Sequence, residues 1–234
     1  VTEAEAVKIL ENTFRDINIA FVNEMAKSFD ALGIDVKNVI EGAATKPFAF
    51  MPHYPGNGVG GHCISVDPYY MIERGRQAGF DHKFLQLARD INNSMPEYAI
   101  SLLDRGVEKL GITEKPIPVA LLGLSYKKDI DDIRESPALE MKEILEKRSD
   151  IALRVYDSHV PHLSTVGSLE DALTGAQVVI LATNHADLCE ELTPENLKKH
   201  GIRFVIDGKN ALDADAIAAA GILYLGIGRT REAQ

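Results

Sequence analysis

Hydrophobic residues recur every three or four positions along the first 32 residues of the chain. These residues are Val7, Leu10, Phe14, Ile17, Phe21 and Met25. Because this spacing follows one face of an α-helix, we predict a single long helix from about Thr2 to Leu32, ended by Gly33 as a C-cap residue. A second, polar line lies near one face of the same helix, since residues four apart stack along a helix. It consists of Lys8, Asn12, Asp16 and Asn23, and it is either solvated surface or the wall of a binding site.

The rest of the first half also has helical patterns, interrupted by one glycine-rich loop. We predict further helices over residues 35–41, 69–79, 81–93 and 96–110. The last of these begins within the segment Ser94-Met-Pro-Glu97, in which Ser94 is the predicted N-cap, the Pro lies in the first helical turn and Glu97 stands at the capping-box position. Residues 1–114 are therefore predicted to form an all-helical domain.

After a short linker at residues 115–118, apolar runs alternate with helical segments. We predict strands over 119–124, 151–156, 177–182, 202–206 and 222–225, and helices over 137–147, 169–173, 194–200 and 214–220. Strands that are apolar on both faces and separated by helices are typical of a parallel sheet covered on both sides. The predicted fold class is α/β, with a Rossmann-like, doubly wound domain over residues 115–234.

Polar residues follow the predicted strands at their carboxyl ends, where open parallel sheets bind ligands. They occupy the segments 125–128, 157–159, 183–185 and 207–209, which indicates either a polar ligand site or ordinary loop polarity. No Gly-x-Gly-x-x-Gly follows a strand, so the sequence has no glycine cradle for a dinucleotide. Lys127, Lys128 and Arg134 are cations that can hold a diphosphate through their side chains instead.

The loop from Pro55 to Tyr70, PGNGVGGHCISVDPYY, carries the strongest candidate chemistry. It places four glycines before His62 and Cys63, and Asp67 follows four residues after the cysteine. Glycines at this density let the backbone approach a ligand closely, and a thiol near a carboxylate is arranged as a nucleophile would be. A tight turn with a cysteine that only packs would show the same residues, because free Cys is usually a small buried hydrophobe.

Composition excludes several classes of function. With 45 % hydrophobic and 26 % charged residues the chain is a globular protein, and its net charge of −10 argues against nucleic acid or an anionic membrane as the main partner. No apolar run approaches the roughly 20 residues that cross a bilayer. Two distant cysteines, Cys63 and Cys189, without a secretory signal indicate a reducing, cytoplasmic environment. His53 and His62 lack metal-ligand spacing, so no metal site is predicted, and Cys189 is expected to be inert.

Three motifs, in this order and spacing, resemble the UDP-glucose/GDP-mannose dehydrogenase family of nucleotide-sugar 6-dehydrogenases. They are ENTFRDINIAFVNE at Glu11–Glu24, the loop at Pro55–Tyr70, and LGLSYKKDIDDIRESPALE at Leu122–Glu140. The segments TKPFAFMPHYPG and VDPYY, which lie within and beside that loop, are most similar to the branch that acts on UDP-N-acetylhexosamines. The resemblance implies a chain that starts at the helical dimerisation domain, continues into a UDP-binding domain and lacks the NAD domain. It also implies a homodimer, which we expect to form through the first helix.

The family reaction is a four-electron oxidation of the sugar C6 alcohol to a carboxylate with two NAD. By resemblance, Cys63 adds to the C6 aldehyde and passes through a thioester, Asp67 activates water, and Asn23 is an active-site asparagine. Arg134 matches an arginine that reaches NAD. The implied substrate contacts are Lys8, Asn12, Tyr54, Gly56, Asn57, Gly58, Gly60, Tyr126, Lys127 and Lys209.

Asn18 departs from the pattern of the UDP-glucose branch, which carries an active-site lysine at the position that aligns with Asn18. An amide carries no positive charge, so the oxyanion partner is expected elsewhere, with Arg15 as one candidate. Three interpretations stay open: part of a UDP-N-acetylhexosamine 6-dehydrogenase, part of a UDP-glucose 6-dehydrogenase, or a fragment that binds UDP-sugars and dimerises without turnover. An unrelated thiol acyltransferase or hydrolase would need a base poised near Cys63, and the adjacent His62 is expected to point elsewhere.

Overall fold

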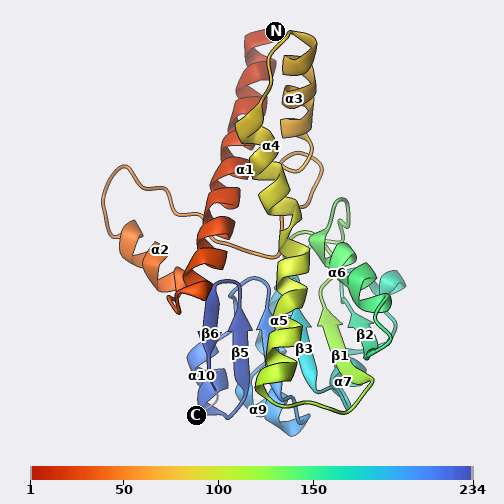
Figure 1. Cartoon of the computed structure of the whole chain (residues 1–234). Helices are drawn as coiled ribbons and strands as arrows, with labels where there is room; N and C mark the ends of the chain where they lie inside the picture. The colour runs from red at the N-terminus through yellow and green to blue at the C-terminus, as the bar shows by residue number, and fades with distance from the viewer. Residues whose placement is uncertain (1, 233–234) are drawn as a thin grey trace.

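The computed structural model describes residues 2–232 and divides into a projecting helical part and a sheet covered by helices (Figure 1). The projecting part contains α1 (Thr2–Ala31), α3 (Asp67–Gln77) and α4 (Lys83–Asn93), which run alongside one another. α2 (Val36–Ala44) branches from the lower end of α1, and its N-cap residue Asp35 accepts hydrogen bonds from the amides of Lys37 and Asn38. The predicted all-helical first part is thus present, with element ends shifted by only a few residues.

The second part is built on a six-stranded sheet with the strand order β2-β1-β3-β4-β5-β6. Five strands are parallel, and β6 pairs with β5 in the antiparallel direction. This confirms the predicted α/β class and the Rossmann-like parallel layer, to which the structure adds one antiparallel edge strand. The strands are β1 (Ile117–Leu122), β2 (Ile151–Tyr156), β3 (Val178–Leu181), β4 (Phe204–Asp207), β5 (Leu223–Gly226) and β6 (Arg229–Arg231).

Helices cover both faces of the sheet, because the central strands are apolar on both sides. One face packs under α5 (Met95–Lys109) and α6 (Pro137–Glu146). The opposite face packs on four short helices, and the 3₁₀ turn η1 (Pro161–Leu163) follows β2. These helices are α7 (Leu169–Leu173), α8 (Ala186–Glu191), α9 (Pro194–Lys199) and α10 (Ala214–Ala219). Alternate residues of the five parallel strands therefore enter two separate hydrophobic clusters.

α5 joins the two parts of the molecule. It follows α4 with only Ser94 between them, yet its apolar face lies on the sheet. A Cβ on its Gly106 would lie 2.4 Å from the ring of Phe204 in β4, so the helix and the sheet approach closely at this glycine. The predicted domain boundary between residues 114 and 115 stays a prediction. One helix that covers the sheet, α5, lies before this boundary in the sequence.

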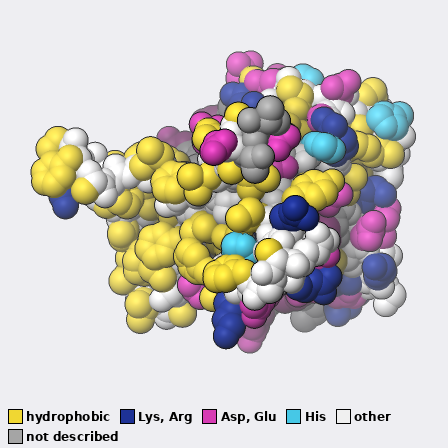
Figure 2. Space-filling view, turned by 90° about the horizontal axis from the view of Figure 1, so that it is seen from above, with side chains coloured by type: hydrophobic (Ala, Val, Ile, Leu, Met, Phe, Trp, Pro, Cys, Tyr) yellow, Lys and Arg dark blue, Asp and Glu magenta, His cyan; other side chains and the backbone are white. Residues whose placement is uncertain are grey.

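The apolar stripe predicted on α1 is largely exposed in this chain. Val7, Leu10, Phe14 and Phe21 expose 55 %, 69 %, 49 % and 54 % of their surface, whereas Ala20, Val22 and Ala26 of the same helix are buried. Figure 2 shows hydrophobic side chains gathered over a broad area of the helical end of the molecule. Among residues 2–232, no helix combines the length and apolar character needed to cross a membrane.

Candidate active site

Cys63 lies on an exposed turn that leads directly into α3. Its backbone carbonyl accepts hydrogen bonds from the amides of Val66 at 3.2 Å and Asp67 at 2.8 Å. Residues 63–67 therefore form a single helical turn, which places Cys63 and Asp67 on the same side of it. The four-residue spacing seen in the sequence thus corresponds to one turn of the backbone, and the joint role of the thiol and the carboxylate stays a prediction.

The polar line on α1 reaches this turn through Asn12. The side-chain amide of Asn12 donates a hydrogen bond to Oδ2 of Asp67 at 2.6 Å, and only 8 % of Asn12 is exposed. Lys8 lies one helical turn earlier, is exposed, and lines the same surface hollow as Asn12. The structure therefore links Asn12 to Asp67, the residue four positions after Cys63, and places Lys8 one turn away in the hollow that Asn12 also lines.

Asn23 occupies a different position from these residues, because it is fully buried. Its Nδ2 donates to Oδ1 of Asn92 at 2.9 Å, and its Oδ1 accepts the backbone N–H of Gly56 at 3.0 Å. Both ends of the amide are thus occupied by the protein, and Asn23 holds the glycine loop against α1. Its role as an active-site group that touches the sugar stays a prediction, and the geometry favours positioning.

A buried network behind Asn23 was not found from the sequence. Asn92 donates to Oδ1 of Asp16 at 2.8 Å, and Arg89 donates to the same oxygen at 2.6 Å. Arg89 and Asp16 expose 3 % and 1 % of their side chains. Burial raises the pKa of Asp16, and the Arg89 guanidinium opposes that rise. These pairs are separated by more than 70 positions in the chain, so no local pattern identifies them.

The glycines of the loop provide close approach to the sheet part of the same chain. A Cβ at Gly60 would lie 2.7 Å from Cβ of Tyr126, and one at Gly61 would lie 2.8 Å from the ring of Tyr126. A Cβ at Gly58 would lie 3.0 Å from Pro137. Gly58 and Gly61 also have φ of +126° and +89°, a region that favours glycine. Gly58 and Gly60, which are predicted substrate contacts, and the neighbouring Gly61 therefore lie in close packing between two parts of the protein.

Asn57 and Lys209 complete the contact between the loop and the strand ends. The amide of Asn57 is buried and donates to the carbonyl of Ala182 at 2.9 Å, and its backbone N–H donates to the carbonyl of Gly208 at 3.1 Å. Gly56 passes close to the ammonium of the half-buried Lys209, since a Cβ there would lie 3.8 Å from Nζ. Burial lowers the pKa of Lys209 to about 8, although the carboxylate of Asp207 opposes that shift.

The other predicted contacts lie at the surface around this loop. Tyr54 and Lys127 are exposed, and Tyr126 is half-buried. Arg134 is exposed and forms a two-pronged ion pair with Asp132, with contacts of 3.0 Å and 2.6 Å. This guanidinium holds the pKa of Asp132 well below its usual range. Arg134 is therefore available at the surface but already carries a carboxylate partner.

Asn18 does not reach the Cys63 turn. Its amide donates to the carbonyl of Phe14 on its own helix at 2.6 Å, and it lines a hollow with Ala49 and Phe50. Arg15 is exposed and lines the hollow that also contains Lys8 and Asn12. The absence of a charge at Asn18 thus leaves the surroundings of Cys63 unchanged.

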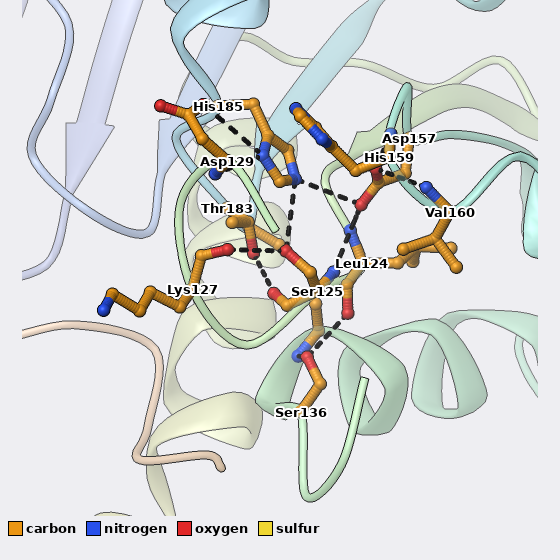
Figure 3. A network of polar contacts seen from close by, with 12 residues as sticks. Leu124, Ser125, Lys127, Asp129, Ser136, Asp157, His159, Val160, Thr183 and His185 are labelled. Carbon is orange, nitrogen blue, oxygen red and sulfur yellow. Dashed lines mark hydrogen bonds and ion pairs between the residues drawn. The ribbon is translucent and has the colours of Figure 1, made fainter. Parts of the chain in front are cut away.

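The polar strand ends form a network with one another (Figure 3). Asp157, after β2, accepts the backbone N–H groups of Ser125 at 3.1 Å and His159 at 2.7 Å, and it also contacts Nε2 of His185 at 3.2 Å. The hydroxyl of Thr183 donates to the carbonyl of Ser125 at 2.5 Å. The hydrogen bond from His185 and those from the backbone lower the pKa of Asp157 despite its burial. Much of the polarity predicted to serve a ligand therefore holds three strand ends together.

Two chemical interpretations of this network fail on its geometry. A Ser–His–Asp relay needs the hydroxyl and the carboxylate on opposite ring nitrogens, whereas Ser125 and Asp157 both face Nε2 of His185. The ligand atoms of Asp129, His159 and His185 lie within 4.8 Å of one another, a grouping that has no metal-ligand spacing in the sequence. However, Nδ1 of the buried His185 accepts the N–H of Asp129 at 2.9 Å, and its Nε2 faces Asp157, so neither ring nitrogen has a lone pair free for a metal.

Cys189 differs from Cys63 in its surroundings. It is half-buried at α8, and burial raises the pKa of its thiol to about 11. A thiol with that pKa stays protonated at neutral pH, which makes it a poor nucleophile. The inertness of Cys189 stays a prediction, which the raised pKa of its thiol supports.

The chain matches the two domains to which its motifs point. Residues 2–94 match the central domain of the UDP-glucose/GDP-mannose dehydrogenase family, and residues 120–214 match its UDP-binding domain. A UDP-N-acetyl-D-mannosamine dehydrogenase of Pyrococcus horikoshii is 39% identical over 229 residues, which are 97% of this chain and 52% of that protein.

Two solved structures of dehydrogenases have the same fold. The UDP-D-ManNAc dehydrogenase of P. horikoshii superimposes with a TM-score of 0.87 over 98% of this chain and 52% of its own. An NDP-N-acetyl-D-galactosaminuronic acid dehydrogenase of Methanosarcina mazei Go1, 31% identical, has a TM-score of 0.85 over 98% of this chain and 51% of its own. The chain spans about half the length of the relatives it matches. Both domain matches occur in chain order, and the glycine loop connects the Cys63 turn with the strand ends. The chain therefore belongs to the UDP-glucose/GDP-mannose dehydrogenase family.

Proposed function

We propose that this chain is the central and C-terminal portion of an NAD-dependent UDP-N-acetylhexosamine 6-dehydrogenase, which oxidises the C6 alcohol to a carboxylate in two steps. The observation that carries the proposal is the 2.6 Å hydrogen bond from Asn12 to Asp67 beside the exposed Cys63 turn. It connects an amide donor to a carboxylate that lies one helical turn after the thiol-bearing Cys63. The substrate class is supported by the names of the relatives, which are dehydrogenases of N-acetylated sugar nucleotides.

A bare aldehyde cannot release a hydride directly to become an acid, whereas its hydrate or a thiohemiacetal can, and the exposed thiol of Cys63 favours the route through the thiohemiacetal. The sulfur of Cys63 forms a bond to C6 of the aldehyde, and a proton goes to the carbonyl oxygen to give a thiohemiacetal. Loss of a hydride from C6 and a proton from that oxygen leaves a thioester. Water then attacks the thioester carbon, Asp67 accepts the proton of the water, and the thiol of Cys63 leaves with a proton.

Asn12 and Lys8 orient and stabilise this chemistry. Asn12 engages Oδ2 of Asp67, so Oδ1 is the oxygen that remains for the water proton. Lys8 supplies the positive charge that Asn18 does not provide, because it lies one turn from Asn12 and lines the same hollow. Lys8 thus takes the role of stabilising the oxyanion, for which Arg15 is the other candidate.

NAD supplies a hydride acceptor when it is bound. Of the residues in this chain, Arg134 suits that partner, because its guanidinium is exposed and its ion pair with Asp132 is a surface contact that an incoming anion would replace. The backbone carbonyl of Arg134 accepts the N–H of Gly61 at 2.9 Å, so the segment with Arg134 is attached to the loop with Cys63. On the substrate side, Lys127 follows β1 and Lys209 follows β4 beside Gly56 of the loop, and these two cations would hold the diphosphate.

Calorimetric titration of this chain with UDP, UDP-GlcNAc and UDP-glucose tests the substrate class. We expect saturable binding of UDP that strengthens with the N-acetyl sugar, and no reduction of added NAD by this chain alone. Lys209→Met is expected to weaken all three ligands together, since it removes a charge near the diphosphate. Preference for UDP-glucose would favour the UDP-glucose 6-dehydrogenase interpretation, and absence of UDP binding would refute the proposed substrate site in this chain.

The role of Cys63 is tested in a polypeptide that carries an NAD domain together with these residues. Cys63→Ser is expected to abolish formation of the uronic acid while sparing binding of the UDP-sugar, because only the second oxidation needs the thiol. Cys189→Ser is the matched control, and we expect full activity. Acid formation at the wild-type rate by the Cys63 variant would show that no thioester is involved.

We also propose that a second copy of this chain covers the apolar face of α1. Leu10, Phe14 and Ile17 line one hollow with Phe80 and Phe84, and the two latter phenylalanines expose 61 % and 64 % of their surface. An exposed apolar area of this kind marks an interaction surface. Sedimentation is expected to give the mass of a dimer at micromolar concentration, and Phe14→Lys is expected to give a monomer. A monomeric wild-type chain would contradict this proposal.

A further inference from the structure

The segment that follows β1 is held in place by a reciprocal contact with the segment that follows β3. The N–H of Asp129 donates to Nδ1 of His185 at 2.9 Å, and Oδ1 of Asp129 accepts the N–H of Ala186 at 2.8 Å. Asp129 has φ +58°, in the left-handed region that only a minority of non-glycine residues adopt. Figure 3 shows His185 between Asp129 on one side and Asp157 and Ser125 on the other.

The tautomer of His185 follows from its partners. Nδ1 accepts a backbone N–H, so the ring proton is on Nε2, which donates toward Asp157 and Ser125. The ring is fully buried and stacks on His159 with centroids 4.4 Å apart. Asp157 does not depend on this ring alone, because it also accepts backbone N–H groups, among them those of His159 at 2.7 Å and Val160 at 3.0 Å. By contrast, the Asp129 contacts connect the two segments directly.

The segment between Ser125 and Asp129 carries two of the proposed substrate contacts, of which Lys127 is the one proposed to hold the diphosphate. Lys127 lies between these residues, and its carbonyl accepts the hydroxyl of Ser125 at 2.7 Å. Tyr126 precedes it and packs on Gly60 and Gly61 of the Cys63 loop. A change in the path of this segment would therefore move a substrate cation and the surface on which the thiol loop rests.

We propose that His185 is a positioning residue whose Nδ1 fixes segment 125–129, and with it Tyr126 and Lys127, for binding of the UDP diphosphate. The inference rests on the proposed function, since it takes UDP as the ligand of this segment. His185 acts through the backbone of Asp129 and touches neither sugar nor phosphate. Its imidazole serves as a fixed acceptor at Nδ1 and a fixed donor at Nε2. This role accounts for a buried histidine at the end of a strand, and it requires neither a bound metal nor a nucleophile.

Two substitutions separate the two nitrogens of this ring. His185→Asn places a carbonyl oxygen near the position of Nδ1 and keeps the acceptor for Asp129, but it loses the donor at Nε2. His185→Gln reaches the position of Nε2 and keeps the donor for Asp157, but it loses the acceptor for Asp129. Asp129→Ala removes the contact to Ala186 from the other side, and it serves as the second variant if His185→Gln does not fold.

The measurements are calorimetric titration with UDP and amide hydrogen exchange of segment 125–129. We expect His185→Gln and Asp129→Ala to weaken UDP binding about tenfold, the factor that one lost hydrogen bond of ordinary net strength gives, and to speed exchange at residue 129. His185→Asn is expected to bind within about threefold of the wild type. Equal weakening by Asn and Gln, or no weakening by a folded Gln variant and by Asp129→Ala, would overturn the inference. If the wild type itself does not bind UDP, the proposed substrate site fails first and this inference falls with it.

Discussion

Gly60→Ala tests whether the loop that carries Cys63 is held by close packing against the sheet part. A methyl group at residue 60 would lie 2.6 Å from the carbonyl oxygen of Glu135, 2.7 Å from Cβ of Tyr126 and 3.0 Å from Cδ of Pro137. Ordinary contacts of a methyl group begin at 3.4 Å. None of these three atoms is the end of a flexible side chain, so the loop or the segment 126–137 has to move by most of an ångström.

The expected effect is a lower free energy of unfolding and weaker substrate binding. Overpacking of this kind costs about 2 kcal/mol, and the free energy of unfolding is measured by urea denaturation at a fixed temperature. The displaced segment carries Tyr126 and Lys127, so we expect UDP to bind more than about tenfold less tightly, which corresponds to a loss of about 1.4 kcal/mol. Calorimetric titration of the same samples measures the second effect.

The chain offers a matched control for this substitution. Gly42 is an exposed glycine of α2, and a Cβ there would meet no atom within 4 Å. Because alanine loses less conformational entropy in a helix than glycine, Gly42→Ala is expected to stabilise the chain by about 0.5–1 kcal/mol. If Gly60→Ala unfolds at the wild-type urea concentration and binds UDP normally, the packing argument is refuted.

Two further predictions concern charge. Burial lowers the pKa of Lys209 to about 8, so the affinity of the wild type for UDP is expected to fall between about pH 7 and pH 9 as this side chain loses its charge. In Lys209→Arg the affinity is expected to stay constant over this range. A constant affinity in the wild type would contradict a contact between Lys209 and phosphate. The unfolded chain binds more protons than the folded chain between this pKa and the ordinary value of about 10.4, so Lys209 makes stability rise with pH there. Arg89→Met leaves Asp16 buried without its cation and is expected to lower the free energy of unfolding by about 3 kcal/mol. The control is Arg76→Met, which breaks the exposed ion pair with Glu73 and is expected to leave the urea midpoint unchanged.

Sequence periodicity predicted the long helices and the five parallel strands because burial of one face or of both faces leaves a repeating pattern. It missed α8, which has only six residues and no side-chain cap. It also missed β6, whose residues Arg229–Arg231 have no apolar pattern. Both arginines of β6 form ion pairs with Asp35 at the start of α2, at 2.9 Å and 2.7 Å. A strand held by contacts with a residue almost 200 positions away has no local signal.

The same distinction applies to the site. The single helical turn that joins Cys63 to Asp67 could be predicted from their spacing. The pairing of Asn23 with Gly56 and Asn92 depends on how α1 and α4 pack, so an asparagine that resembles a catalytic group is placed inside the protein. His185 could be assigned to a strand end, but the choice between ligand contact and internal support required its two ring partners.

The position of Cys63 depends on both parts of the chain, because the glycine loop is attached on two sides. Asn23 on α1 accepts the N–H of Gly56, while Asn57 and Gly61 bond to carbonyl groups of the sheet part, Ala182 and Arg134. Six residues separate Gly56, which is bonded to Asn23, from Cys63. A relative movement of α1 and the sheet would therefore be transmitted to the thiol, and a ligand that contacts Lys8 on one side and Lys127 on the other would fix that relative position. Under the proposed function, binding of the UDP-sugar itself sets the geometry in which Cys63 meets the C6 carbon.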